Sequence, residues 1–481
     1  MRCKFTKKIR KIVTLQPRFQ EVEIFTMAQQ KVPTALGTEK VSKLLMQYAV
    51  PSIIAMTASS LYNMVDSIFI GQGVGAMAIS GIAITFPLMN ITAAFGSLVG
   101  VGAATLTSVK LGQKDYDTAR RVLGNVVVLN VLLGLMLTVF TLPILDPILY
   151  FFGASENTIP YARDYMQVIL IGNIVTHLYF GQNALLRSSG HPEKAMYATI
   201  ATVLVNTILD PIFIFGLDMG IRGAAIATVI AQSLSLMWQI HLFSNKNELL
   251  HFQPGIFKLK KKIVLDSLAI GLSPFLMNLA SCVVVILINN ALVTHGGDYA
   301  IGAYGLVNRL VFVAIMVVMG FNQGMQPIAG YNFGARHYDR VTQVFKLTVM
   351  WATGVTTFAT ILCMGIPELL VRIFTTDEEL IRISVKAMRI ILLVFPVVGF
   401  QMVTGNFFQS IGMASKAIFL SLTRQLIFLL PCILILPNIF GENGVWFSMP
   451  ISDAIATIVA GVMLWQQFRA FKKHEELKIE N

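Results

Sequence analysis

Long apolar segments, separated by polar or Gly/Pro-containing breaks, recur along the whole chain of 481 residues. A helix needs about 20 apolar residues to cross the hydrocarbon core of a membrane. By this measure we expect twelve spanning helices, at 42–70, 78–109, 119–145, 159–187, 193–217, 222–244, 263–294, 299–332, 339–366, 380–411, 415–438 and 445–468. The predicted fold class is an all-α polytopic membrane protein.

The scarcity of charge supports this fold class and excludes others. Only 13% of the residues are charged, whereas a soluble domain carries roughly 25%. A soluble enzyme, a nucleic-acid-binding protein and a disordered regulator are therefore excluded, and we attribute the net charge of +12 to membrane topology. The cysteines are too far apart for a CxxC metal site or a disulfide scaffold, since they lie at Cys3, Cys282, Cys363 and Cys432.

Basic residues are distributed unevenly between the connections. Fourteen lie in one alternating set of connections and four in the other. Because Lys and Arg are retained on the cytoplasmic side of a membrane, we expect the first set and both termini to be cytoplasmic. The first set is Lys110, Lys114, Arg120, Arg121, Arg187, Lys194, Lys246, Lys258, Lys260, Lys261, Lys262, Arg336, Arg340 and Lys416, and the second is Arg163, Arg222, Arg372 and Arg382.

The first 26 residues lack an apolar core of signal-peptide length, so we do not expect a cleaved secretory signal. Met27 opens a polar stretch that leads directly into the first span. Our hypothesis is that Met27 is the natural start, and intact mass of the protein expressed from its own upstream DNA would test it. The alternative is a basic arm lying on anionic lipid.

The two halves of the chain match at a fixed offset of 222 residues. Six helices lie in each half, and because six is even, both halves enter the membrane in the same direction. We therefore expect two parallel six-helix lobes around a central cleft, an architecture typical of alternating-access transporters. The matched positions are Ala78-Ile79 with Ala300-Ile301, Gly112 with Gly334, Tyr116-Asp117 with Tyr338-Asp339, Ser188 and Gly190 with Ser410 and Gly412, and Lys194-Ala195 with Lys416-Ala417.

The domain boundaries follow from the repeat and the charge pattern. We expect a basic extension at 1–40, an N-lobe at 41–245 and a basic cytoplasmic linker at 246–262. A C-lobe at 263–470 and a cytoplasmic tail at 471–481 complete the chain.

Ionisable residues at membrane depth are costly, so each one is a candidate functional group. Tyr62 lies four residues before Asp66, and Asn206 lies four residues before Asp210, so each pair shares a helix face. We expect an oxygen-rich site for a proton or a sodium ion in the N-lobe, and the alternative is a structural hydrogen-bond network. The candidates are Asp66, Asp210, Asn206, Thr228, Tyr62 and Asn183.

The C-lobe differs at these positions. At the repeat offset, Asp66 falls near Asn289 and Asp210 near Leu430, so the fold does not require the carboxylates. This asymmetry favours the N-lobe as the place where cation binding is coupled to transport. The C-lobe has its own intramembrane charges, which either pair structurally or serve in the cleft, and these are Arg309, Arg424 and Asp453.

The chain resembles the multidrug and toxic compound extrusion (MATE) family over roughly residues 40–470. The resemblance rests on NMVDSIFIG in the first helix, ILDPIF in the fifth, GAAIAT in the sixth and QPIAGYNFGA at the end of the eighth. The last motif is similar to the MepA-type bacterial branch, and it comprises Gln326, Pro327, Gly330, Tyr331, Asn332, Phe333, Gly334 and Ala335.

The resemblance implies a monomeric antiporter of the bacterial cytoplasmic (inner) membrane, coupled to H⁺ or Na⁺, that exports amphipathic, often cationic drugs. It implies no cofactor, no structural metal and no nucleic-acid partner, and membrane lipids as neighbours. Carried over, the family's cation site is Asp66, Asn206, Asp210 and Thr228, with Tyr62 adjoining and Asn183 nearby. The alternative is a lipid or lipid-linked-sugar flippase of the same superfamily. A membrane-embedded enzyme would need a DDxxD or HExxH motif, and the sequence has neither.

Overall fold

The computed structural model describes residues 34–479, and the hypothesis on residues 1–26 lies outside them. The described chain is almost entirely helical, with no strand. The N-lobe and the segments beside it contain α2 (Ala35–Thr38), α3 (Val41–Gly73), α4 (Ala76–Gly112), α5 (Tyr116–Thr141), a 3₁₀ turn (Leu142–Ile144), α6 (Leu145–Phe151), α7 (Ile159–Ile171), α8 (Asn173–Ser188), α9 (Pro192–Pro211), a π turn (Ile212–Gly216) and α10 (Gly220–Phe243).

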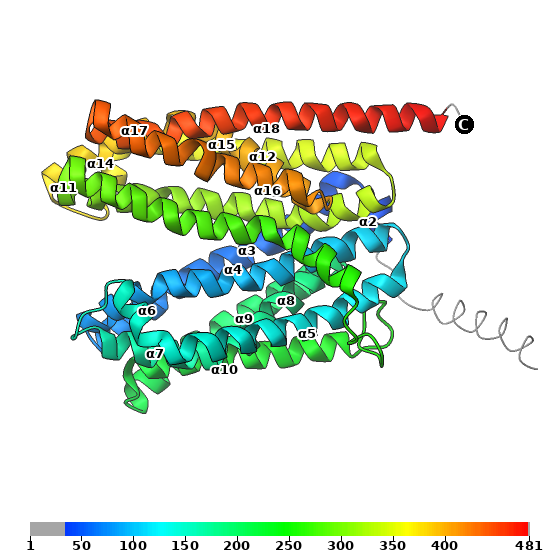
Figure 1. Ribbon diagram of the computed structural model, residues 1–481, viewed down its shortest axis with the longest axis horizontal. Coiled ribbons are helices and arrows are strands. Elements are labelled where there is room, and N and C mark those ends of the chain that lie inside the picture. Colours follow the sequence, from blue (N-terminus) through cyan, green and yellow to red (C-terminus); the bar gives the residue numbers. More distant parts are fainter. Residues whose placement is uncertain (1–33, 480–481) are drawn as a thin grey trace, which may run out of the picture.

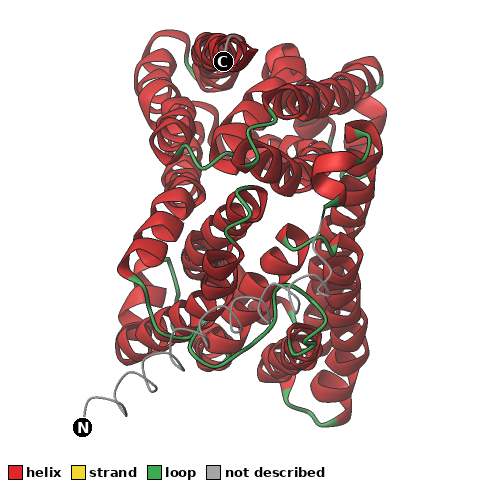
Figure 2. Ribbon diagram, turned by 90° about the vertical axis from the view of Figure 1, so that its right-hand side faces the viewer, coloured by secondary structure: helices red, strands yellow, loops and turns green. Residues whose placement is uncertain are grey.

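The C-lobe follows the same order. It contains α11 (Lys261–Gly334), α12 (Tyr338–Gly365), α13 (Pro367–Arg372), α14 (Glu378–Ile391), a 3₁₀ turn (Leu392–Val394), α15 (Phe395–Ser410), α16 (Ala414–Leu422), a π turn (Thr423–Leu429), α17 (Leu430–Phe440) and α18 (Glu442–Ile479). Figure 1 shows α3 to α10 as one bundle and α11 to α18 as another, with their long axes roughly aligned, and the end-on view in Figure 2 shows the same two groups. The predicted all-α, two-lobed fold class is confirmed.

Eleven helices of the described chain are long and apolar enough to cross a membrane. The difference from the twelve predicted lies at 159–187, where the chain forms two shorter helices, α7 and α8, that meet at Gly172. At the repeat offset, the C-lobe has a 3₁₀ turn that ends at Val394 and separates α14 from α15. Both lobes interrupt a helix at the same position of the repeat, so the interruption is a feature of the fold.

Two glycines make the sharp turns between the first two helices of each lobe. Gly75 joins α3 to α4 with φ +107°, and Gly297 lies within α11 with φ +69°. Positive φ values of this kind cost a residue with a Cβ atom roughly 1–2 kcal/mol, and glycine avoids that cost. The turn at Gly297 divides α11 into the two helices predicted at 263–294 and 299–332.

The lobes touch through a reciprocal backbone contact between α4 and α11. A Cβ atom added at Gly112 would overlap the carbonyl oxygen of Tyr331, and one added at Gly334 would overlap the carbonyl oxygen of Val109. Val109 and Tyr331 are themselves 222 residues apart, so the contact follows the internal symmetry. The glycines at these helix ends therefore permit the close approach of the two lobes.

Two of the expected domain boundaries fall inside packed structure. Leu36, in the expected N-terminal extension, is buried, and its carbonyl oxygen accepts hydrogen bonds from Asn332 (2.9 Å) and Arg340 (3.2 Å). At the other end, α18 continues past residue 470, because Phe471 stacks on Tyr338 with ring centroids 4.8 Å apart.

Candidate functional site

The two N-lobe carboxylates come from helices that pack against each other. Asp66 lies in the second half of α3, and Asp210 is the penultimate residue of α9. The side chains are buried, with 8% of Asp66 and 0% of Asp210 exposed, and the two carboxyl groups interact with each other. The structure thus brings together the pair that the sequence placed 144 residues apart.

Three further candidates complete this cluster. The Asn206 amide donates a hydrogen bond of 2.7 Å to Asp210 Oδ1, which confirms that the two share a face of α9. The hydroxyls of Tyr62 and Thr228 lie 3.0 Å apart and link α3 to α10. Tyr62 is also near both carboxylates. All five groups present oxygen atoms, the ligand type that hard cations prefer.

Two carboxylate oxygens of the cluster, Asp66 Oδ1 and Asp210 Oδ2, are buried without a hydrogen-bond partner among the described residues. An unpaired buried carboxylate costs several kcal/mol, and two adjacent ones repel each other. Uptake of a proton or a cation would remove much of this cost. The arrangement is therefore suited to reversible cation binding.

Tyr165 is a member of this cluster that sequence reasoning missed. It lies in α7, is buried and is near both Asp66 and Asp210. Its neighbours Asp164 and Gln167 are polar, so the sequence carried no specific signal for it. The π turn at Ile212–Gly216, directly after Asp210 and Pro211, is another local irregularity at the site, and such turns occur often at functional sites.

Asn183 is placed elsewhere. Its amide donates to the Ala195 carbonyl (2.9 Å) and to the Thr199 hydroxyl (3.3 Å), and its oxygen accepts from Arg187. Thr199 lies seven residues before Asn206 on α9, which corresponds to roughly 10 Å along the helix axis. Asn183 is thus hydrogen-bonded about two turns from Asn206 and three turns from Asp210.

The C-lobe charges divide into a pair and a single exposed residue. Arg424 donates to both oxygens of Asp453, at 2.6 and 3.5 Å, so these two charges form an ion pair. Arg309 is exposed on α11 and has no ion pair with another described residue. The described residues contain no group of three or more His, Cys, Asp or Glu side chains arranged to hold a metal ion.

The motif at the end of the eighth predicted helix lies where the lobes meet. Gln326 donates to the Thr105 hydroxyl of α4 at 2.8 Å, and Asn332 donates to the Leu36 carbonyl oxygen of α2 at 2.9 Å. A Cβ atom at Gly330 would come within 2.9 Å of the Ser108 side chain and the Ser410 carbonyl oxygen. The motif thus serves close packing between the lobes, and it is not part of the carboxylate cluster.

A sequence model of the family described as MatE matches residues 51–212 and again residues 272–434. The two matches begin 221 residues apart and end 222 residues apart, in agreement with the internal repeat. The chain belongs to the MatE family. This confirms the resemblance to the MATE family that the motifs indicated.

Curated relatives and solved structures agree with this assignment. Multidrug export protein MepA of Staphylococcus haemolyticus (strain JCSC1435) is 29% identical over 418 residues, which cover 87% of this chain and 92% of that protein. MepA of Staphylococcus aureus (strain MSSA476) is 28% identical over 425 residues, covering 88% and 94%.

The structural neighbours are transporters of the same family. The MATE multidrug transporter DinF-BH, solved with a ligand bound, is 38% identical with a TM-score of 0.84, and the match covers 90% of this chain and 98% of that one. An outward-facing MATE family transporter of the MOP superfamily has a TM-score of 0.87 at 23% identity, with 92% and 99% covered, and shares the fold.

Proposed function

We propose that this protein is a cation-coupled antiporter that exports amphipathic, often cationic drugs by alternating access of its two lobes. The multidrug export named for its MepA relatives, and the multidrug transport named for its 38%-identical neighbour DinF-BH, support the substrate class. The proposal includes a bacterial inner-membrane location with both termini in the cytoplasm. The coupling ion is H⁺ or Na⁺.

The observation that carries the coupling proposal is the buried Asp66–Asp210 pair. Each carboxylate has an oxygen without a partner among the described residues, so the occupied and empty forms of the site differ strongly in free energy. Coupling requires a cation that interacts differently with the two conformations of the transporter. Because Asp66 lies on α3 and Asp210 on α9, a change in the packing of these helices would change the affinity of the site.

The test uses purified protein in proteoliposomes with a fluorescent cationic drug. Drug transport is driven first by a pH gradient in sodium-free buffer and then by a sodium gradient at fixed pH. We expect one of the two gradients to drive transport, and the effective gradient identifies the ion. The Asp66→Asn variant should fold normally and lose gradient-driven transport.

Asp266→Asn serves as the matched control, since Asp266 lies in α11, outside the cluster, and should tolerate the change. Full gradient-driven transport by Asp66→Asn would refute the N-lobe site. If neither gradient moves the drug in the unmodified protein, the antiporter proposal fails and lipid flipping becomes the function to test.

A further inference from the structure

Polar side chains continue from the carboxylate cluster toward the opposite end of the N-lobe. On α9 they recur every three or four residues, which places them on one face of the helix. α10, which packs against α9, repeats the pattern in the opposite direction. The α9 stripe is Asp210, Asn206, Thr202 and Thr199, and the α10 stripe is Thr228, Gln232, Ser235 and Gln239.

A third helix, α8, packs against both of these helices and supplies a matching stripe. Its members, in order away from the carboxylate cluster, are Thr176, Tyr179, Asn183 and Arg187. Their spacing is again three or four residues, so they share one face. Three helices thus contribute polar side chains at the same successive levels of the N-lobe.

Hydrogen bonds join the three stripes at several levels. Thr176 donates to Gln232 Oε1 at 2.6 Å, between α8 and α10. One turn further, Thr202 donates to the Ser235 hydroxyl at 2.7 Å, between α9 and α10. The next level is the α8–α9 contact, where the Tyr179 hydroxyl donates to Thr199 at 3.4 Å.

A short distance along α9 separates these hydrogen bonds from the carboxylate pair. Asn206, which is bonded to Asp210, lies four residues from Thr202, and this corresponds to roughly 6 Å along α9. We call the set formed by the three stripes the polar file. It extends from Asp210 to the end of α8, where Asn183 accepts a hydrogen bond from Arg187.

The polar file also contains an amide that the protein does not satisfy. Gln239 is 0% exposed, and neither its nitrogen nor its oxygen has a partner among the described residues. Leaving such an amide unpaired costs roughly 2–7 kcal/mol. A structural network would be expected to satisfy its members, whereas a path for water or a cation needs free donors and acceptors along its length.

The C-lobe shows that the fold does not require these polar groups. At the 222-residue offset, Asn206 corresponds to Phe428, Gln232 to Ala454 and Gln239 to Gly461. On the third helix, Asn183 corresponds to Gly405 and Thr176 to Val398. The C-lobe keeps polar side chains at five of the twelve positions, so the complete polar file is present only in the lobe that has the carboxylate pair. These five are Gln401, Gln409, Ser421, Arg424 and Thr457.

We propose that the polar file is the route by which the coupling cation passes between the Asp66–Asp210 site and the cytoplasm, inside the N-lobe and apart from the path taken by the drug. This rests on the proposed cation coupling and adds its intracellular route. Hydroxyl and amide groups at successive levels would carry a proton through intervening water or replace part of the hydration shell of Na⁺.

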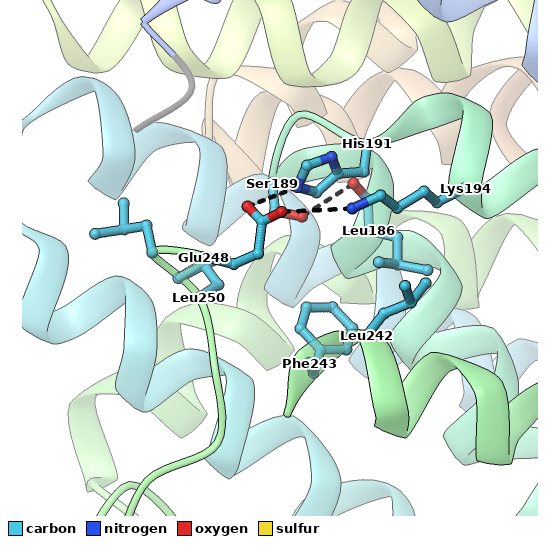
Figure 3. Close-up of a pocket in the computed structure, with 9 residues that line it drawn as sticks. Leu186, Ser189, His191, Lys194, Leu242, Phe243, Glu248 and Leu250 are labelled. Atoms are coloured by element: carbon cyan, nitrogen blue, oxygen red, sulfur yellow. Dashed lines mark hydrogen bonds and ion pairs between the residues drawn. The ribbon is translucent and has the colours of Figure 1, made fainter. Parts of the chain in front are cut away.

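The polar file ends beside a small cavity of about 20 Å³ at the junction of α8 and α9 (Figure 3). Glu248, from the linker, reaches His191 at 3.1 Å and Lys194 at 3.4 Å across this cavity. Such a volume is enough for about one water molecule. The cytoplasmic end of the polar file thus has room for water beside the Glu248–Lys194 ion pair.

The test blocks the file at two levels without touching the carboxylates. Thr202→Val removes a hydroxyl while keeping the shape, and Gln239→Leu removes the unpaired amide. The matched controls are Thr457→Val and Gln401→Leu in the C-lobe. In proteoliposomes we would measure gradient-driven drug transport, drug–drug exchange without a gradient, and the concentration of the coupling ion that half-saturates transport.

We expect each N-lobe variant to lower the gradient-driven rate by about tenfold, the effect on a barrier of one missing hydrogen bond to the passing ion or to its water. Drug–drug exchange and the half-saturating ion concentration should stay unchanged, and so should both controls. Thr202→Ser keeps the hydroxyl and should keep the rate, which separates loss of the route from misfolding.

An unchanged gradient-driven rate in Thr202→Val and Gln239→Leu would overturn the proposal. An equal loss of exchange and of apparent ion affinity would overturn it too, since the residues would then only hold the lobe together. Failure of the proposed function is recognised separately, because the unmodified protein would show no dependence on either ion gradient.

Discussion

The Arg424–Asp453 pair in the C-lobe allows a quantitative test of structural pairing. The closest approach is 2.6 Å, and the side chains are 30% and 13% exposed. Removing one member of a buried pair costs about 3–5 kcal/mol, because the remaining charge is left without compensation. Replacing both members by apolar residues of similar volume is close to neutral.

The two single variants should therefore differ in a defined order. Arg424→Met leaves Asp453, the more buried charge, and should cost about 3 kcal/mol. Asp453→Leu leaves Arg424, whose longer and more exposed side chain can reach water, and should cost about 2 kcal/mol. The double variant should lie within about 1 kcal/mol of the unmodified protein, which requires strong coupling between the two sites.

Unfolding by SDS in mixed micelles would give the four free energies of this cycle. A coupling energy below about 0.5 kcal/mol would refute the pairing argument, because independent sites are additive within that margin. Drug transport by the stable double variant provides a second readout. Retained transport assigns the pair to structure, whereas lost transport assigns it to the cleft.

Two further predictions concern packing and pH. Gly112→Ala should lower the free energy of unfolding by about 1–3 kcal/mol, because the added Cβ atom overlaps the Tyr331 carbonyl. Gly354→Ala in α12 is the control: its Cβ atom meets nothing within 4 Å, so it should raise the free energy of unfolding by up to about 1 kcal/mol. Equal thermal shifts for the two variants would contradict this expectation. Burial acts to raise the pKa of Glu248, but its basic neighbours His191 and Lys194 outweigh this and hold the pKa below its usual range. A lowered carboxyl pKa stabilises the fold above the unfolded-state pKa, so Glu248→Gln should cost up to about 1 kcal/mol at pH 7, and the difference should vanish as the pH falls through the folded-state pKa. A difference that persists or grows at low pH would contradict the assignment.

The lengths of the apolar segments and the internal repeat predicted most of this fold, and the exceptions have physical reasons. The break at Gly172 was missed because membrane helices tolerate glycine in their interior, so composition does not distinguish a bend from a straight helix. The faces shared by Asn206 with Asp210, and by Tyr62 with Asp66, followed from helical spacing alone.

What spacing could not predict is which helix faces meet. The Tyr62–Thr228 bond joins residues 166 positions apart. The position of Tyr165 depends on how α7 is rotated against α4 and α10, the helices on which it packs. Asn183 was expected at the carboxylates, but the register between α8 and α9 brings it to Thr199 instead. These are consequences of packing between helices, which periodicity within one helix does not contain.

The reciprocal contact between Gly112 and Tyr331, and between Gly334 and Val109, has a consequence for the history of the chain. A patch that meets its own repeat-equivalent is the isologous type of interface, which two identical chains form in a twofold dimer. Two copies of a half-length ancestor could therefore have associated in this way before they were fused. Only after fusion could one half keep a pair of carboxylates while the other lost or never acquired it.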